Sequence, residues 1–285
     1  MNAGTKLCCL IGSPVGHSLS PLIHNTLAGM MGINMAYTAF CVAPDDVGDA
    51  VRGALAMNFG GLNVTVPHKC TVMKYLIEID PLALDIGAVN TLVPSEHGFK
   101  GYNTDITGLK RELLEENIEI KGQSVIILGA GGASNAITYL CAQMGAEHIW
   151  LLNRSVGKAQ VLADRVNEKF GNIVEPMAPD DYRNIPKGKY PVIQTTSVGL
   201  FPNTDAAPIE DDDFYELVSA GVDIIFNPAE TAFMKKCRNA GAPAYNGLKM
   251  LLYQGIAAFE LWNHVTVPQE MADEVLKMLQ KELGY

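Results

Sequence analysis

Two hydroxyl side chains in the segment GHSLSP (residues 16–21) stand at a spacing that one ligand could use. Ser18 and Ser20 are two residues apart, so in extended backbone both point the same way. Ser20 also precedes a proline, which is the pattern of a helix N-cap, and capping alone would account for it. Capping does not account for Ser18, so the pair indicates a polar ligand.

A second polar segment, NVTVPHK (residues 63–69), lies on a predicted strand and the turn after it. Asn63 and Thr65 share one face of that strand, and two valines take the other. Lys69 follows at the end of the strand, where α/β sheets place ligand crevices. A surface lysine after a proline turn is the alternative interpretation of Lys69.

Amide and carboxylate side chains follow in GAVNT (residues 87–91) and GYNTD (residues 101–105). Asn90 offers a donor and an acceptor, and Asp105 a carboxylate. Asp105 opens a predicted helix, so on its own it is most simply interpreted as a helix cap. A lysine amine and an aspartate carboxylate can both take up or release a proton, which is the chemistry of general acid and base catalysis.

The strongest single motif, SVIILGAGGASNA (residues 124–136), predicts a dinucleotide site. An apolar strand runs into small residues and a helix begins at once, which lets the backbone approach a pyrophosphate at the helix N-terminus. Ser134 takes the third position of the G-x-G-x-x-G pattern and is small enough for close packing. An ordinary glycine-rich loop is the alternative, but the placement between strand and helix favours the dinucleotide.

The end of the next predicted strand indicates which dinucleotide binds. It reads HIWLLNRS, with Asn153, Arg154 and Ser155 and without the carboxylate that usually holds the ribose of NAD. Arg154 can pair with a 2′-phosphate, Ser155 can donate a hydrogen bond, and Lys158 adds a second cation. Arg154 and Lys158 could instead be solvated surface cations. The residues at this strand end favour NADP over NAD.

Strand-like and helix-like segments alternate along the chain, and the pattern restarts near residue 105. The alternation predicts an α/β fold of two domains, each an α/β sandwich with a mainly parallel sheet, the C-terminal half being a Rossmann-type NADP domain. The predicted strands cover residues 6–12, 36–42, 61–66, 124–129, 148–152, 191–195 and 222–226, with short β-like pieces at TLVP and FKGYN. The predicted helices cover residues 21–31, 44–57, 105–117, 133–144, 156–169, 230–240, 247–263 and 268–283, and further helical segments are expected between the strand at 61–66 and about residue 86.

The composition is that of a folded, acidic protein. Of 285 residues 48% are hydrophobic and 18% charged, which permits a sizeable core. The net charge of -10 disfavours binding to nucleic acid or to anionic membrane surfaces. The six cysteines form no CxxC pair and suit a reducing cytoplasm, and no residues have the spacing of metal ligands. No apolar run approaches the ~18 residues of a membrane span. A cytoplasmic protein without a metal is expected, as a monomer or a homodimer.

Taken together, the motifs resemble the shikimate dehydrogenase family along essentially the whole chain. The matching segments are HSLSP, NVTVPHK, GAVNT, NTD, GAGGAS, NRS, TSVG and GLKMLLYQG. The resemblance implies a substrate-binding catalytic domain of residues 1–106 plus 247–285 and an NADP-binding domain of residues 107–246. It also implies reversible NADP-dependent oxidation of shikimate to 3-dehydroshikimate, a step of aromatic amino-acid biosynthesis.

The resemblance also assigns roles to individual residues. Lys69 and Asp105 are similar to the catalytic pair of the family. The positions that match substrate contacts are Ser18, Ser20, Asn63, Thr65, Asn90 and Gln254. The positions implied to contact NADP are Gly129, Ala130, Gly131, Gly132, Ala133, Asn153, Arg154, Ser155, Lys158, Thr195, Ser197, Gly199, Ile224 and Gly247.

The chain departs from the family pattern at two positions. Phe226 stands where the family commonly has tyrosine, and Gln194 where asparagine is more usual. Without a tyrosine hydroxyl, the substrate carboxylate loses one hydrogen bond, worth about 1.5–3 kcal/mol, unless a residue such as Tyr37 replaces it.

Three other functions are compatible with parts of the pattern. Quinate dehydrogenase, or a dual quinate/shikimate enzyme, would use the same residues, and Phe226 sits where the two acids could be distinguished. A non-catalytic NADP-binding sensor would not need both Lys69 and Asp105. The related methylenetetrahydrofolate dehydrogenase architecture would not need the two serines of HSLSP.

Overall fold

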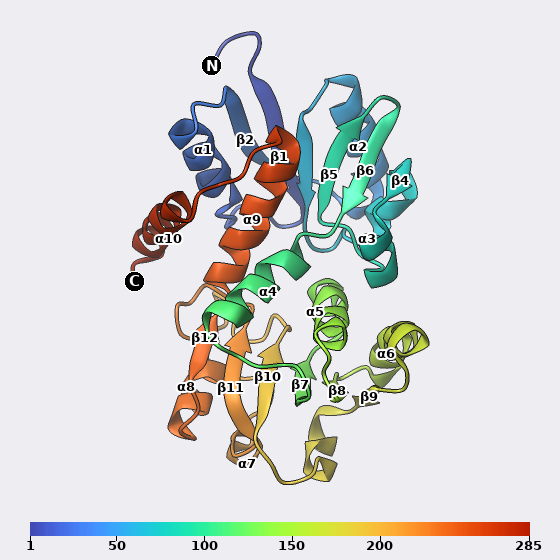
Figure 1. Ribbon diagram of the computed structural model, residues 1–285, viewed down its shortest axis with the longest axis vertical. Helices are drawn as coiled ribbons and strands as arrows, with labels where there is room; N and C mark the ends of the chain where they lie inside the picture. The colour runs from blue at the N-terminus through green and yellow to red at the C-terminus, as the bar shows by residue number, and fades with distance from the viewer. The chain divides into compact units, whose positions relative to one another are not determined.

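The computed structural model describes residues 1–285 and divides into two compact units. The first unit comprises Met1–Leu109 and Leu251–Gly284, and the second comprises Lys110–Met250 and Tyr285. The chain passes from one unit to the other within two helices, α4 (Asp105–Glu115) and α9 (Leu248–Asn263), both labelled in Figure 1. The unit boundaries at residues 109 and 250 fall a few residues after the sequence-based boundaries at 106 and 246.

The first unit contains a six-stranded, mainly parallel sheet in the order β2-β1-β3-β5-β6-β4. Its strands are β1 (Lys6–Gly12), β2 (Met35–Cys41), β3 (Gly61–Val64), β4 (Glu78–Ile79), β5 (Thr91–Ser95) and β6 (Gly98–Tyr102). Strand β1 pairs in parallel with β2 and β3, whereas β5 is antiparallel to both of its neighbours. The two β-like pieces TLVP and FKGYN thus form an antiparallel pair within this sheet.

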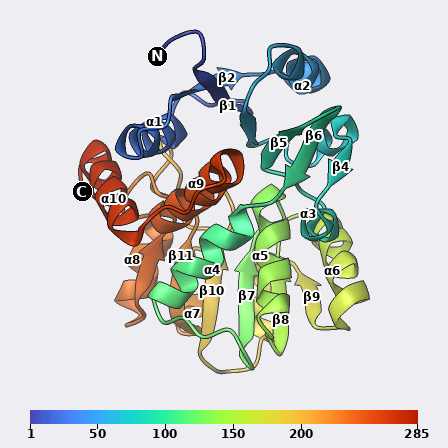
Figure 2. The ribbon, with the colours of Figure 1, turned by 45° about the horizontal axis from the view of Figure 1, so that its top comes forward.

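Helices cover both faces of this first sheet, as Figures 1 and 2 show. Its helices are α1 (Ser20–Met30), α2 (Val47–Ala56), α3 (Pro81–Ile86), α10 (Gln269–Leu283) and most of α9. Cys9 and Ile11 of β1 pack with residues of α2 and α3. On the other face Trp262 of α9 packs over Gly61, where a Cβ would lie 2.2 Å from the indole. Two covered faces explain why β1 is a continuous apolar run instead of an alternating one.

The second unit contains a six-stranded sheet in the order β12-β11-β10-β7-β8-β9, and every neighbouring pair is parallel. Its strands are β7 (Ser124–Leu128), β8 (His148–Leu152), β9 (Val174–Met177), β10 (Tyr190–Gln194), β11 (Val218–Asp223) and β12 (Ala244–Asn246). Counted from β7, the strand order from β9 to β12 is 3-2-1-4-5-6, which is the order of the Rossmann fold. The order reverses between β7 and β10, and such folds bind dinucleotides at that point.

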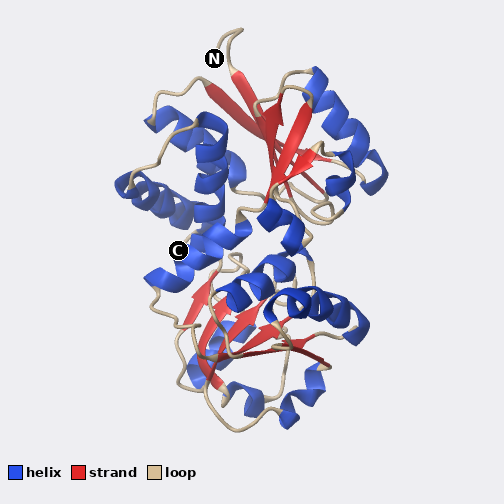
Figure 3. Ribbon diagram, turned by 45° about the vertical axis from the view of Figure 1, so that its right-hand side comes forward, coloured by secondary structure: helices blue, strands red, loops and turns tan.

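Helices also flank the sheet of the second unit (Figure 3). They are α5 (Gly132–Gln143), α6 (Val156–Phe170), α7 (Asp212–Tyr215), α8 (Ala232–Asn239) and most of α4. The core under the strands is rich in aromatic side chains, with Phe214, Tyr215 and Phe233 almost fully buried. No helix in either unit is both long enough and apolar enough to cross a membrane.

Two predicted strands end at least two residues earlier than expected. The strand predicted at 222–226 is β11, which starts at Val218 and ends at Asp223, because the Asp223 side chain accepts a hydrogen bond from the Ile225 backbone amide at 2.9 Å and turns the chain. Strand β3 ends at Val64, so Thr65 follows the strand instead of sharing its face with Asn63. Strands β4, β9 and β12 were not predicted; each is short and lies at a sheet edge, where few apolar residues are required.

Candidate active site

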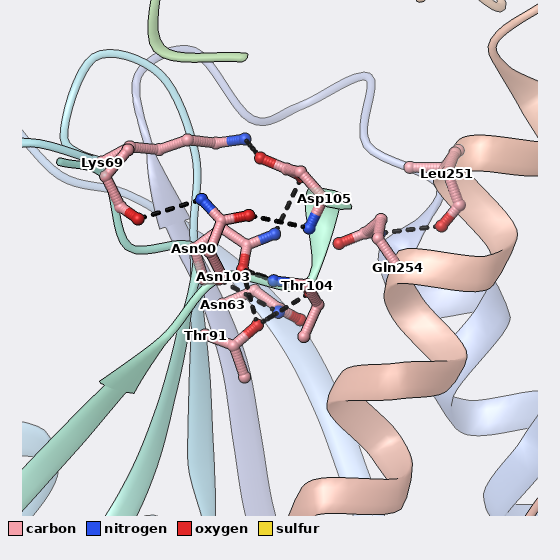
Figure 4. Close-up of polar contacts among 10 residues, drawn as sticks. Asn63, Lys69, Asn90, Thr91, Asn103, Thr104, Asp105, Leu251 and Gln254 are labelled. Carbon is pink, nitrogen blue, oxygen red and sulfur yellow. Dashed lines mark hydrogen bonds and ion pairs between the residues drawn. The ribbon is translucent and has the colours of Figure 1, made fainter. Parts of the chain in front are cut away.

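An ion pair joins the two sequence-predicted catalytic residues. Lys69 Nζ donates a hydrogen bond to Asp105 Oδ2 at 2.6 Å, with the two side chains 12% and 6% exposed (Figure 4). Lys69 lies after β3, and its carbonyl accepts a hydrogen bond from the Val89 amide at 2.9 Å. Asp105 is the first residue of α4. Two residues that are 36 positions apart thus meet within one unit.

Asn90 holds the second oxygen of the Asp105 carboxylate. Its Nδ2 donates to Asp105 Oδ1 at 2.8 Å, and its Oδ1 accepts from the backbone amide of Thr104 at 2.7 Å. Because a backbone N–H can only donate, this contact orients the Asn90 amide with its NH₂ group toward the carboxylate. The helix-cap interpretation of Asp105 is therefore wrong: its side chain binds Lys69 and Asn90, and Asn103 Oδ1 accepts the Asp105 backbone amide at 3.1 Å.

Asn63 extends this network toward β2. Its Nδ2 donates to Thr91 Oγ1 at 3.1 Å, and its Oδ1 accepts from the Tyr37 hydroxyl at 2.7 Å. Tyr37 is buried, and burial raises the pKa of its hydroxyl well above the ordinary value. The Tyr37 hydroxyl therefore keeps its proton and donates it to Asn63. Because that proton is engaged, Tyr37 cannot also donate a hydrogen bond to a substrate carboxylate.

Ser18, Ser20, Thr65 and Gln254 lie in the same unit but outside this hydrogen-bond network, and of these only Gln254 is labelled in Figure 4. Ser18 Oγ accepts the backbone amide of Ser20 at 3.2 Å, and Ser20 begins α1. Thr65 packs its methyl group over Gly12, where a Cβ would lie 2.3 Å away. Gln254 of α9 donates to the Leu251 carbonyl at 2.8 Å, and its side chain points toward the Asp105 cluster in Figure 4.

The glycine-rich turn lies at the carboxyl end of β7. Gly129 has a φ of +108°, and a Cβ there would lie 2.6 Å from Thr195 Oγ1, so no other residue fits without strain. Ser134 Oγ donates to the Gly129 carbonyl at 2.6 Å and closes the turn from within α5. A Cβ at Gly131 would meet no atom within 4 Å, so the space in front of α5 is open. The turn offers backbone amides and room to a phosphate group.

The three residues after β8 and Lys158 lie at the next strand end. Asn153 Nδ2 donates to the Ser155 carbonyl at 2.8 Å, which shapes the turn into α6. Ser155 is the residue before α6, but its hydroxyl makes no capping hydrogen bond. Arg154, Ser155 and Lys158 are all exposed. Two cations and a hydroxyl are thus available to an anionic group beside the glycine turn.

The predicted nicotinamide contacts follow the carboxyl ends of β10, β11 and β12. Thr195 Oγ1 donates to the Leu128 carbonyl at 2.7 Å and so ties its loop to β7. The Ile224 amide donates to the Gln194 carbonyl at 3.1 Å, and the Gly247 amide to the Ile225 carbonyl at 3.0 Å. All the predicted cofactor residues therefore lie at the carboxyl ends of the strands of the second sheet or just after them. These residues and the open turn suit a dinucleotide with an additional phosphate.

Sequence reasoning did not assign a role to the side chains that support these loops. Gln194 is fully buried; its Nε2 donates to the carbonyls of Thr196 and Val198, both at 3.2 Å, and its Oε1 accepts the Thr196 amide. Asp223 also accepts a hydrogen bond from Thr231 Oγ1 at 2.7 Å, and burial raises the pKa of this carboxyl to about 7. The signals in the sequence were their positions at strand ends and, for Gln194, its departure from the asparagine that is usual in the family.

Phe226 is half-buried in the loop after β11. Its backbone carbonyl accepts a hydrogen bond from the Tyr285 hydroxyl at 2.8 Å, and Asn246 Nδ2 donates to the same hydroxyl at 3.4 Å. Residue 226 itself carries no hydroxyl, and Tyr37 is engaged with Asn63. The predicted loss of a carboxylate contact at residue 226 stays a prediction.

Substitution of Gly247 by alanine is expected to weaken NADP binding by at least about tenfold and to lower the melting temperature. A Cβ at Gly247 would lie 2.2 Å from the Ile224 carbonyl oxygen, so the backbone of one of these two proposed cofactor contacts must move. Fluorescence titration with NADPH and thermal unfolding measure the two effects. The control is Gly157→Ala in α6, where a Cβ would meet nothing within 4 Å. Unchanged NADPH affinity in Gly247→Ala would contradict a cofactor role for this turn.

Comparisons with known proteins match both units of the chain. Residues 10–92 match the shikimate dehydrogenase substrate binding domain, residues 112–177 the shikimate / quinate 5-dehydrogenase family, and residues 247–276 the shikimate 5'-dehydrogenase C-terminal domain. The shikimate dehydrogenase (NADP(+)) of Halothermothrix orenii is 40% identical over 265 residues, which are 92% of each chain.

Two solved structures share the fold along nearly the full length. A shikimate dehydrogenase in complex with NADP+ has a TM-score of 0.87 and 39% identity, covering 98% of this chain and 97% of that one. The shikimate 5-dehydrogenase of Listeria monocytogenes, in complex with shikimate and NAD, has a TM-score of 0.88 and 31% identity, with 98% of each chain covered. With its site geometry, its sheet order and these similarities, the chain belongs to the shikimate dehydrogenase family.

Proposed function

We propose that the protein is a shikimate dehydrogenase, which catalyses the reversible NADP-dependent oxidation of shikimate to 3-dehydroshikimate. The observation that carries this proposal is the Lys69–Asp105 ion pair, held by Asn90 in a network of buried amides. An amine and a carboxylate so placed can exchange a proton with a substrate hydroxyl. Relatives 40% identical along most of the chain carry the same name.

The proposed substrate site lies in the first unit. Lys69 and Asp105 act on the hydroxyl that is oxidised, and Asn63, Asn90, Thr65 and Gln254 bind the other polar groups of the ring. Ser18 and Ser20 bind the carboxylate. The network supports these assignments because it fixes the amide orientations of Asn63 and Asn90 before any substrate arrives.

The proposed cofactor is NADP, bound by the second unit. The backbone of Gly129–Ala133 would hold the pyrophosphate, Asn153, Arg154, Ser155 and Lys158 the adenosine 2′-phosphate, and the loops of Thr195–Gly199, Ile224 and Gly247 the nicotinamide. The free Ser155 hydroxyl, the two exposed cations and the absence of a carboxylate at this strand end support the phosphorylated dinucleotide over NAD.

The mechanism follows from the ion pair. When bound, NADPH supplies the hydride for the substrate carbonyl. Lys69 Nζ donates its proton to the oxygen that becomes the hydroxyl, and Asp105 orients the amine through Oδ2. In the direction of oxidation, the Lys69–Asp105 pair takes up the hydroxyl proton.

Initial rates with shikimate and quinate, each with NADP and NAD, test the proposed function. The proposal predicts the highest kcat/KM for shikimate with NADP, and the formation of reduced nicotinamide measures it. A higher kcat/KM for quinate would favour the quinate or dual enzyme, for which Phe226 is the specific reason. No reduced nicotinamide with either acid, together with tight NADP binding, would favour a non-catalytic sensor.

We place this enzyme in the cytoplasm, in aromatic amino-acid biosynthesis, and without a nucleic-acid or membrane partner. None of the six cysteines forms a disulfide, which suits a reducing compartment. The net charge of -10 opposes association with nucleic acid. The first unit leaves the β2 edge of its sheet unpaired within the chain, so both a monomer and a homodimer are compatible with the fold.

A further inference from the structure

A carboxyl group of α4 is buried outside the network described above. Glu112 is 1% exposed, and its Oε2 has no hydrogen-bond partner. Its carboxyl accepts a hydrogen bond from the backbone amide of Met250, in the first turn of α9. Carboxylic acids are rarely buried unless they are paired. A buried carboxyl group with one unpartnered oxygen therefore calls for an explanation, and the groups that contact it provide one.

The residue immediately before α9 cannot cap the helix with a side chain of its own. The residue before the helix is Gly247, which has no side chain and cannot gain one, because a Cβ would lie 2.2 Å from the Ile224 carbonyl. The first amides of a helix must nevertheless be satisfied. Asn246 Oδ1 accepts the Leu248 amide at 3.2 Å, and Glu112 accepts the Met250 amide. Part of the cap of α9 is thus supplied by another helix.

Lys249 reinforces the junction between the same two helices. Its Nζ pairs with Glu116 and lies 3.4 Å from Glu115 Oε2, so three consecutive residues of α9, counting Leu248, are tied down. The ion pairs are partly exposed, with Lys249 30% exposed, and such pairs contribute little alone. The contact between Glu112 and the Met250 amide, in contrast, is buried.

We propose that Glu112 is a positioning residue, which holds the first turn of α9 against α4 and thereby fixes Gly247 and the helix that carries Gln254. This inference rests on the proposed function, in which Gly247 contacts the cofactor and Gln254 the substrate. It assigns to α4 a second role besides carrying Asp105 at its start.

The contact depends on protonation. Burial, together with the charges of Glu116 and Glu115, raises the pKa of Glu112 to about 8, and Lys249 and the Met250 amide oppose the rise. The charged side chains that act on it are Glu115 and Glu116 of α4 and Lys249 of α9. At neutral pH the carboxyl is mostly neutral and can occupy its apolar site. Above about pH 8 it becomes a buried anion beside two other carboxylates, which weakens the junction.

Two variants separate the cap from the charge. Glu112→Gln keeps an oxygen that can accept the Met250 amide and cannot ionise, whereas Glu112→Leu removes the acceptor. Glu168→Gln, on the exposed face of α6, is the control for loss of one negative charge. The kcat and KM for shikimate and NADP are measured from about pH 6 to about pH 9.5, with amide hydrogen exchange of α9 in the same holoprotein.

The proposal predicts that kcat/KM of the unmodified protein falls about threefold or more relative to Glu112→Gln above about pH 8, mainly through KM. After correction for the intrinsic effect of pH on amide exchange, the Leu248–Leu252 amides of the unmodified protein should exchange faster above the same pH midpoint as the fall in kcat/KM. The same amides of Glu112→Gln should show no such acceleration. Glu112→Leu should show the faster exchange and raised KM at every pH, and Glu168→Gln neither effect.

Superimposable pH profiles of the unmodified protein and Glu112→Gln would overturn the protonation dependence, and normal exchange and KM in Glu112→Leu would overturn the positioning role. Hydrogen exchange does not require turnover. If the protein does not oxidise shikimate, the exchange data still decide whether Glu112 holds α9, so the two proposals fail separately.

Discussion

Replacement of Lys69 by alanine is expected to lower kcat for shikimate oxidation by at least about a hundredfold, since a positioned general acid or base contributes about 10² to 10⁴. The substitution removes the only group other than Asn90 that binds the Asp105 carboxylate. The dissociation constant of NADP should be nearly unchanged, because all proposed cofactor contacts lie in the other unit. Steady-state kinetics and fluorescence titration with NADPH measure the two quantities.

Two controls separate the loss of chemistry from a loss of folding. Lys69→Met keeps the apolar stem but not the amine, and it should be as inactive as the alanine variant. Lys74→Ala, at an exposed lysine five residues on, should retain normal kcat. Because Asp105 would be left buried with one partner, the melting temperature of each variant is also required. Near-normal kcat in a folded Lys69→Ala protein would remove Lys69 from the mechanism.

Replacement of Arg154 by alanine is expected to raise the KM for NADP about ten- to a hundredfold. A hydrogen bond to a charged group contributes about 1.5–3 kcal/mol, and about 1.4 kcal/mol corresponds to a factor of ten. The KM for NAD should change little, because NAD lacks the 2′-phosphate that the guanidinium would bind. The NADP/NAD ratio of kcat/KM measures the effect directly.

The matched control for Arg154 is Arg165→Ala, at another exposed arginine of the same unit, which should leave the ratio unchanged. Addition of salt should weaken NADP binding more in the unmodified protein than in Arg154→Ala, since the contact is electrostatic. Equal losses of affinity for NADP and NAD in Arg154→Ala would contradict a role in recognising the 2′-phosphate.

The positions of the polar motifs at strand ends could be predicted from sequence because they depend on local periodicity. The run SVIIL followed by glycines forms β7, the turn and α5 as expected, with Gly129 in the left-handed region. The alternation of strands and helices also indicated two α/β sandwiches, and the parallel order around β7 is the Rossmann order.

The partners of the polar residues could not be predicted, because they come from distant parts of the chain. Asp105 looked like a helix cap, yet Asn103 accepts its backbone amide and frees the carboxylate for Lys69. Strand β9 contains Pro176, which is tolerated because β9 is an edge strand, and that position is a property of the sheet.

The burial of polar side chains, like the identity of their partners, could not be predicted from local sequence patterns. Glu112 belongs to the acidic stretch RELLEE, which is typical of an exposed helix face. It is 1% exposed in the structure, and it accepts a hydrogen bond from the Met250 amide in the first turn of α9, more than a hundred residues later. The supporting roles of Gln194 and Asp223 arise in the same way, from loops that meet at adjacent strand ends.

Isotope transfer from shikimate gives the most direct test that Lys69 and Asp105 serve hydride transfer from a single alcohol carbon. Shikimate deuterated at the carbon that bears the oxidised hydroxyl is incubated with the protein and NADP+, and both products are analysed by mass spectrometry. We expect 3-dehydroshikimate without the label and NADPH with one deuterium per turnover, with neither formed by Lys69→Ala at a comparable rate. Unlabelled NADPH, or labelled NADPH formed equally fast by the variant, would contradict this account.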